Sequence, residues 1–232
     1  MTIKFIKEYS FEDSGNLVKT TRIKDYLLSQ ENNIIEDIPW QSDFDTGLLP
    51  YDIVTRSGGY NIFNSKHINA CSDLQDLLIF IRDSYSDYIN NILPNKSFNN
   101  NSLTPQINAW VNVLREDETF GTHQHTVEYN DLWSFISAAM CIDAKSTSTV
   151  YDYVETPESP SDAVFGSKTI ENKPGVLTIF PPFYFHYSTR NTDYTRVSLG
   201  MDIFFHKSHL AEGSDHKNIC LDLPDYNSMS NT

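Results

Sequence analysis

Residues 195–205 read Thr-Arg-Val-Ser-Leu-Gly-Met-Asp-Ile-Phe-Phe, and their alternation of apolar and polar side chains decides the fold class. A side-chain period of two is typical of a β-strand with one buried face. The apolar face holds Val197, Leu199, Met201 and Ile203, and the opposite face holds Arg196, Ser198, Gly200 and Asp202. If the second face also points inward, Arg196 needs an anionic partner, because burying an uncompensated charge is costly.

Working outward from this strand, we expect further regular elements. Other strands are expected at residues 107–115, 133–142 and 175–180. Residues 72–93 carry apolar side chains at intervals of three and four, which predicts a helix that packs on the sheet. A shorter helix is expected at residues 22–30. One long helix followed by many short strands predicts an α+β fold with a β-sandwich or barrel as its core.

The composition narrows the classes of protein and partner. The chain has 232 residues, a length that fits one large domain. Its net charge of −14 argues against a nucleic-acid backbone or an anionic membrane as partner. The three cysteines are never spaced as Cys-x-x-Cys, which is typical of a reduced compartment. Without an apolar leader or a run of about 18 apolar residues, we expect a cytoplasmic protein and make no prediction of its oligomeric state.

Three of the seven histidines form a candidate metal site. His123 and His125 are two residues apart, so in an extended stretch both imidazoles point to the same face. Two imidazoles this close favour a metal ion between them. His186 follows the strand expected at 175–180 and precedes the strand that begins near Arg196. The other histidines, which we expect to be ordinary surface residues, are His67, His206, His209 and His216.

Arg196 and Ser198 share one strand face and suit a small dicarboxylate. The guanidinium fork binds a carboxylate in two places, and the serine hydroxyl adds a third hydrogen bond.

The order of these motifs resembles the iron(II)- and 2-oxoglutarate-dependent oxygenases: a closely spaced ligand pair comes first, then a distal histidine, then Arg-x-Ser. More closely, the chain resembles the 2-oxoglutarate/Fe(II) oxygenase family of bacteria and their phages. The stretches that carry the resemblance are Arg56-Ser57-Gly58-Gly59-Tyr60, then Asn108-Ala109-Trp110-Val111-Asn112 with His123-Gln124-His125 and residues 135–143, and then residues 175–181 through His186 and Asn191 to Arg196-Val197-Ser198.

The resemblance covers roughly residues 56–205 and implies a fold and an activity. The implied fold is α+β, with a double-stranded β-helix core (jelly-roll, cupin-like) and flanking N-terminal helices. One oxygenase domain would span residues 1–232, with its core at about 56–205, an N-terminal support region at 1–55 and a C-terminal tail at 206–232. The implied reaction uses Fe(II), 2-oxoglutarate and dioxygen to hydroxylate an unactivated C–H bond of an amino acid, a peptidyl residue or a small metabolite.

The resemblance also implies a metal site at His123, His125 and His186. The usual site of this kind has two histidines and one carboxylate, and the carboxylate position falls at His125. The site therefore has either three histidines or a carboxylate from Asp131 or Glu128. No catalytic residue is expected beyond the metal site.

The cosubstrate site is implied in the same way. Arg196 and Ser198 would bind the far carboxylate of 2-oxoglutarate. Asn108 and Asn112 would face the same cavity as Trp110 and hydrogen-bond the cosubstrate or the substrate. The alternative for the two asparagines is a polar ladder on a strand that faces solvent.

An acidic insertion is expected at residues 152–162, and Tyr151 and Tyr153 stand at its start. This segment is either a lid over the site or a disordered surface loop.

Three rival functions also fit the candidate site. Three histidines would suit a non-haem iron dioxygenase that does not use 2-oxoglutarate, although that class has no need of Arg196 and Ser198 as a carboxylate clamp. A non-catalytic β-sandwich binding protein would keep the fold but not the metal ion. A zinc hydrolase would suit the ligands, but the sequence has no distinctive motif for its general base.

Overall fold

The computed structural model describes residues 5–11, 17–36, 57–58, 62–91, 106–125, 128–129, 132–155, 164–192 and 194–206. The helices are α1 (Leu17–Ser29), α2 (Glu31–Glu36), α3 (Ser65–Ala70) and α4 (Asp73–Asn91). The strands are β1 (Lys7–Ser10), β2 (Ser57–Gly58), β3 (Gln106–Leu114), β4 (Glu128–Tyr129), β5 (Leu132–Asp143), β6 (Ser148–Glu155), β7 (Val164–Glu171), β8 (Val176–Phe180), β9 (Phe185–Ser188) and β10 (Arg196–His206). None of these helices is long and apolar enough to cross a membrane.

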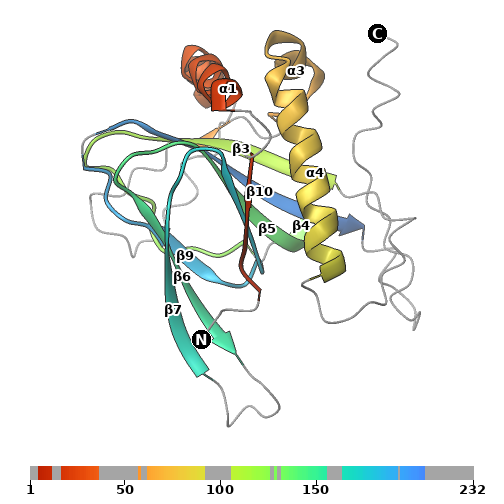
Figure 1. Cartoon of the computed structure of the whole chain (residues 1–232), viewed down its shortest axis with the longest axis vertical. Coiled ribbons are helices and arrows are strands. Elements are labelled where there is room, and N and C mark those ends of the chain that lie inside the picture. Colours follow the sequence, from red (N-terminus) through yellow and green to blue (C-terminus); the bar gives the residue numbers. More distant parts are fainter. Residues whose placement is uncertain are drawn as a thin grey trace.

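The strands form a large and a small antiparallel sheet. The large sheet has the order β1-β8-β5-β10-β3-β2, with β4 paired to β5, and the small sheet has the order β7-β6-β9. Figure 1 shows α1, α3 and α4 on one side of the large sheet and the small sheet on the other. The large sheet is therefore covered by helices on one face and by strands on the other.

The helix-covered face of the large sheet holds the main hydrophobic core. The apolar face predicted for residues 195–205 is buried there against α4, as expected for the helix predicted at 72–93. Each fully buried Leu or Ile side chain stabilises such a core by about 1.5–3 kcal/mol. The strand contributes Val197, Leu199, Met201 and Ile203, and the helix contributes Leu74, Leu77, Ile81, Tyr85 and Tyr88. The polar face of β10 is left to point toward the small sheet.

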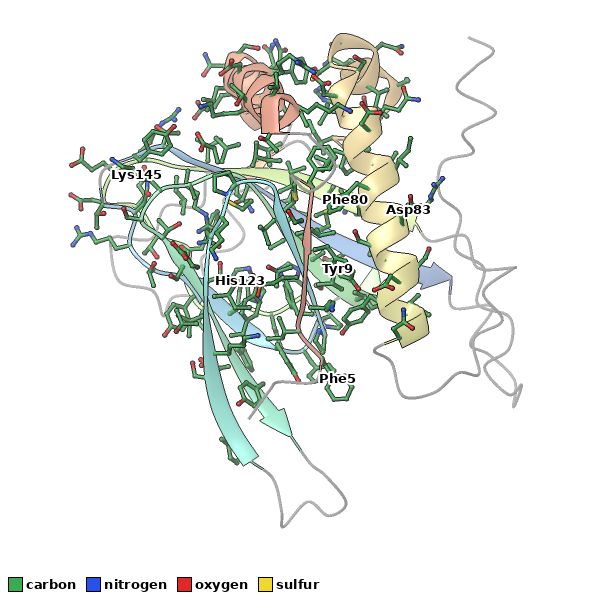
Figure 2. The ribbon with its side chains drawn as sticks, viewed as in Figure 1. Phe5, Tyr9, Phe80, Asp83, His123 and Lys145 are labelled. Carbon is green, nitrogen blue, oxygen red and sulfur yellow. The ribbon has the colours of Figure 1, made fainter. Side chains whose placement is uncertain are left out.

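Polar contacts fix the position of α4. Arg22 Nε and Nη2 donate to Asp73 Oδ2 (2.6 Å) and Oδ1 (2.7 Å), which joins α1 to α4. The Tyr9 hydroxyl donates to Asp87 Oδ2 (2.9 Å), which joins β1 to α4, and Figure 2 shows Tyr9 beside that helix. The helix is therefore tied at both its beginning and its end.

Most of the predicted elements are present. The strands predicted at 107–115, 133–142, 175–180 and 195–205 correspond to β3, β5, β8 and β10, within one residue at either end. The short helix predicted at 22–30 begins earlier, at Leu17. The strands β6, β7 and β9 were not predicted, although they build the whole small sheet.

One prediction was wrong at its first residues, and another was wrong outright. The acidic insertion predicted at 152–162 begins inside β6, which extends to Glu155, while residues 156–163 lie outside the described ranges. His67, predicted to be a surface residue, is buried, and its Nδ1 atom lies 2.8 Å from the Tyr26 hydroxyl. Tyr26 lies 41 residues from His67 in the sequence, so the polarity of the residues around His67 does not reveal this partner.

Candidate functional site

Backbone hydrogen bonds bring His123, His125 and His186 together. The His123 N–H donates to His186 O (3.0 Å), and the His186 N–H donates to His123 O (2.9 Å), in an antiparallel bridge. The His125 N–H donates to Pro182 O (2.9 Å). The ring centroids consequently lie 4.2, 4.8 and 5.2 Å apart. One potential ligand atom from each histidine lies within 4.8 Å of the other two, so the three side chains can hold one metal ion.

Each of these rings has an oxygen atom beside its Nδ1 atom. Carbonyl and carboxylate oxygens only accept hydrogen bonds, so Nδ1 carries a proton in each ring and Nε2 is the nitrogen left to face a metal ion. Metal-binding histidines adopt this arrangement, in which the nitrogen that does not bind the metal donates to an acceptor that fixes the ring orientation. The acceptors are Gly121 O for His123 (2.7 Å), Asp202 Oδ1 for His125 (2.9 Å) and Tyr184 O for His186 (3.1 Å).

The surroundings keep two of the three rings uncharged. Desolvation lowers the pKa of His123 to about 4, and repulsion from His125 adds to the effect. Desolvation also lowers the pKa of His186 well below its usual value, followed by repulsion from His123 and His125. His123 as a whole residue is exposed, but packed groups around its ring still desolvate it. Neutral imidazole is the form that binds metal ions, so these two rings are ready to act as ligands near pH 7.

Arg196 is a buried cation at the start of β10. Only 5% of its surface is exposed. Its Nε and Nη1 atoms have no hydrogen-bond partner within the described part of the chain. Burial lowers the pKa of the guanidinium, because the charged form loses its hydration. A buried cation with unsatisfied donors is costly, so this position suits an anionic ligand.

A small cavity beside Arg196, with room for about one water molecule, is lined by side chains from both sheets. Ser198 lies in this lining and shares the strand face of Arg196, as the sequence predicted. The hydroxyl groups and the guanidinium together offer the donors that a carboxylate accepts. Among the lining residues are Cys141, Thr178 and Ser198 from the large sheet and Thr149, Tyr151 and Ile170 from the small sheet.

Tyr151 links this cavity to the histidine cluster. It is buried on β6 directly opposite His186 of β9, and the two rings stack. From the sequence, Tyr151 is expected at the start of an insertion, and its position opposite His186 is not predicted. A strand signal is nonetheless present, because residues 148–155 are rich in β-branched and aromatic side chains.

Strand β3 places Asn108, Trp110 and Asn112 on the same face of the sheet as the polar side chains of β10. They lie opposite Asp202, Gly200 and Ser198, respectively. The Trp110 ring lies 5.3 Å from the His125 ring, between centroids. The two asparagines are thus on the side of the sheet that faces the histidine cluster.

The structure also supplies a carboxylate near the cluster. Of the two fallback ligands, Asp131 lies outside the described residues, and only the backbone of Glu128 is described, in β4. Asp202 instead contacts the cluster through His125. The sequence places Asp202 on the polar face of its strand but indicates no role for it.

Comparisons with known proteins bear on the fold. No family model matches the sequence, and no curated protein matches it. The chain is structurally similar to a prolyl-4-hydroxylase of Pseudomonas putida, with a TM-score of 0.54 and 11% identity over 85% of this chain and 91% of that chain. It is also similar to a viral collagen prolyl hydroxylase from Paramecium bursaria Chlorella virus-1, in complex with 2-oxoglutarate. Here the TM-score is 0.50 and the identity 10%, over 86% of this chain and 96% of that chain. A third similar structure is a Trichoplax adhaerens prolyl hydroxylase in complex with a hypoxia inducible factor peptide. Its TM-score is 0.53 and its identity 10%, over 87% of this chain and 84% of that chain.

This chain has the double-stranded β-helix fold. Its two facing sheets explain why residues far apart in the sequence share one interior. Figure 2 shows His123 among the side chains between the sheets, away from Lys145 at the outer turn between β5 and β6. At such low identity the likeness concerns the double-stranded β-helix alone, so any chemistry has to be argued from the residues in that interior.

Proposed function

We propose that this protein is an Fe(II)- and 2-oxoglutarate-dependent dioxygenase. His123, His125 and His186 hold the metal ion, and Arg196 with Ser198 binds the far carboxylate of 2-oxoglutarate. One observation carries the proposal: a buried guanidinium, with Nε and Nη1 unpartnered among the described residues, lines a cavity that shares Tyr151 with a cluster of three converging histidines. Together these features match a metal site beside a dicarboxylate site.

The donor groups fit both ligands. Imidazole nitrogen is a suitable ligand for iron, and three protein ligands leave coordination positions free. On the other side of Tyr151, the guanidinium of Arg196 and the hydroxyl of Ser198 suit one carboxylate by charge and by geometry. The family resemblance in the sequence and the double-stranded β-helix fold support the same assignment.

The roles of this chain's residues follow from their positions. The bound metal supplies the redox chemistry, in which 2-oxoglutarate, dioxygen and R–H give succinate, carbon dioxide and R–OH. Arg196 orients the cosubstrate by its far carboxylate. Asn108 and Asn112 are placed to hydrogen-bond the cosubstrate or the substrate. Trp110 beside His125 and Tyr151 against His186 flank the cluster with aromatic rings, which limits the access of water.

A peptidyl residue is the first substrate class to test. Two of the similar structures are, by name, a collagen prolyl hydroxylase and a prolyl hydroxylase in complex with a peptide. In this chain Phe183 and Phe185 are 56% and 48% exposed, and they precede His186. They offer apolar surface to a substrate next to the cluster. Comparing a proline-containing peptide with free proline and a small metabolite as substrates distinguishes the three classes.

Spectroscopy under anaerobic conditions tests the proposal. The protein is titrated with Fe(II) and then with 2-oxoglutarate while visible absorbance is followed. We expect a metal-to-ligand charge-transfer band in the wild type, no band in His186→Ala, and a requirement for much more 2-oxoglutarate in Arg196→Ala. Iron binding without the band would favour a three-histidine dioxygenase that does not use 2-oxoglutarate. No iron binding would overturn the metal site and favour a binding protein.

A further inference from the structure

A buried carboxylate lies behind the histidine cluster. Asp202 stands on β10, opposite Ser137 of β5 and Asn108 of β3. Its Oδ1 atom accepts hydrogen bonds from His125 Nδ1 (2.9 Å) and from Ser137 Oγ (2.6 Å). Ser137, Asp202 and His125 are all buried. They form one chain of hydrogen bonds that ends at a candidate metal ligand.

The net charge of the three-histidine ligand set explains what these hydrogen bonds contribute to the metal site. Three neutral imidazoles bring no negative charge to a divalent cation, whereas the usual two-histidine, one-carboxylate site brings one. An uncompensated charge is costly in a buried site, and a carboxylate one hydrogen bond away offsets it. A carboxylate in this position also fixes the orientation of the imidazole and raises the basicity of its ligating nitrogen.

We propose that Asp202 is a positioning residue of the metal site, which provides through His125 the negative charge that a three-histidine ligand set lacks. Ser137 holds the Asp202 carboxylate in the required orientation. The inference rests on the proposed function, because it assumes that His123, His125 and His186 bind a metal ion. It goes further by assigning the charge of the site to a residue that contacts neither metal nor substrate.

Titration of the full chain with Co(II), followed through the visible absorbance of the bound ion, tests the inference without turnover. Asp202→Asn keeps the shape and an acceptor oxygen but removes the charge. We expect its Co(II) dissociation constant to rise roughly 10–100-fold and its absorption bands to shift. Ser137→Ala leaves the carboxylate in place but less well oriented, so a smaller rise is expected. Asp143→Asn is the matched control on β5, because Asp143 pairs with Lys24 (3.0 Å) instead of a histidine.

The outcomes separate this inference from the proposed function. Wild-type Co(II) affinity and absorption bands in folded Asp202→Asn would overturn the inference and leave the metal site standing. An equal loss of affinity in Asp143→Asn would also overturn it, because the effect would then be general destabilisation. If Asp202→Asn does not fold, Ser137→Ala is tested instead, and wild-type Co(II) affinity and absorption bands in that variant would overturn the inference. A wild-type protein that binds neither Co(II) nor Fe(II) would remove the metal site itself, and both proposals with it.

Discussion

The ring of Tyr151 stacks on the ring of His186, with centroids 5.6 Å apart and planes inclined by 22°. The Tyr151 side chain also lines the Arg196 cavity and hydrogen-bonds Thr178. A single residue of the small sheet therefore contacts a candidate metal ligand and the candidate anion site at once. Its ring and its hydroxyl have separable roles, which two substitutions can distinguish.

Tyr151→Phe keeps the stacked ring and removes the hydroxyl from the anion cavity. We expect 2-oxoglutarate to bind about 10-fold more weakly or worse, because hydrogen bonds to charged groups contribute about 1.5–3 kcal/mol. Co(II) affinity should stay unchanged, since the ring against His186 remains. The measurement is a 2-oxoglutarate titration of the metal-loaded protein. Tyr153→Phe, the same change two residues along β6, is the control, and an equal effect there would contradict the assignment.

Arg196→Met replaces the buried cation with an apolar side chain of similar length. We expect the free energy of unfolding of the apoprotein to stay the same or to rise by about 1–3 kcal/mol, since a buried charge with unsatisfied donors opposes folding. The metal ion should stabilise both proteins, whereas 2-oxoglutarate added to the metal-loaded protein should further stabilise the wild type much more than the variant. Urea unfolding without ligands, with metal alone and with both ligands measures these effects.

A matched control for that substitution is Arg115→Met. Arg115 is partly exposed and forms an ion pair with Glu31, so its replacement should not stabilise the apoprotein. If Arg196→Met strongly destabilised the apoprotein, Arg196 would have a structural role rather than one in anion binding.

Acid should destabilise the apoprotein between about pH 6.5 and pH 4. On folding, the pKa of His123 falls from 6.5 to about 4, and the pKa of His186 is lowered as well. In this window the unfolded chain binds more protons than the folded chain, so the free energy of unfolding rises with pH and levels off above pH 6.5. His186→Gln should reduce this dependence, as measured by urea unfolding at several pH values. An undiminished slope in the variant would contradict the low pKa of His186.

Gly200→Ala should disturb the packing of Trp110 beside the histidine cluster. A Cβ atom at position 200 would lie 2.5 Å from the Trp110 ring, so the indole would have to move away from its place beside His125. We expect a loss of about 1–3 kcal/mol in the free energy of unfolding. Adding Trp110→Leu to Gly200→Ala should recover part of this loss, because the smaller side chain leaves room for the methyl group. No recovery in thermal unfolding would show that the strain lies elsewhere.

The local pattern of apolar and polar residues was sufficient to predict much of the large sheet. Alternation along β3 and β10 and the apolar run of β5 follow directly from burial on one or both faces, and all three strands appear close to their predicted bounds. Likewise, the helical spacing of residues 72–93 predicted α4 and its packing on the sheet. The strands β6, β7 and β9 were not predicted. The β-branched and aromatic run of β6 was interpreted as the start of an insertion, β7 contains a glycine and charged side chains, and β9 has only four residues.

The sequence by itself determined which residue types were available for a site: two closely spaced histidines, a distal histidine, and an arginine two residues before a serine. Only the tertiary structure decided that Tyr151 lies between the histidine cluster and Arg196, and that Asp202 accepts a hydrogen bond from His125. The first relationship depends on the pairing of β6 with β9, and the second joins residues 77 positions apart in the sequence. A residue's own neighbours in the sequence carry no information about the partner that such pairing places opposite it.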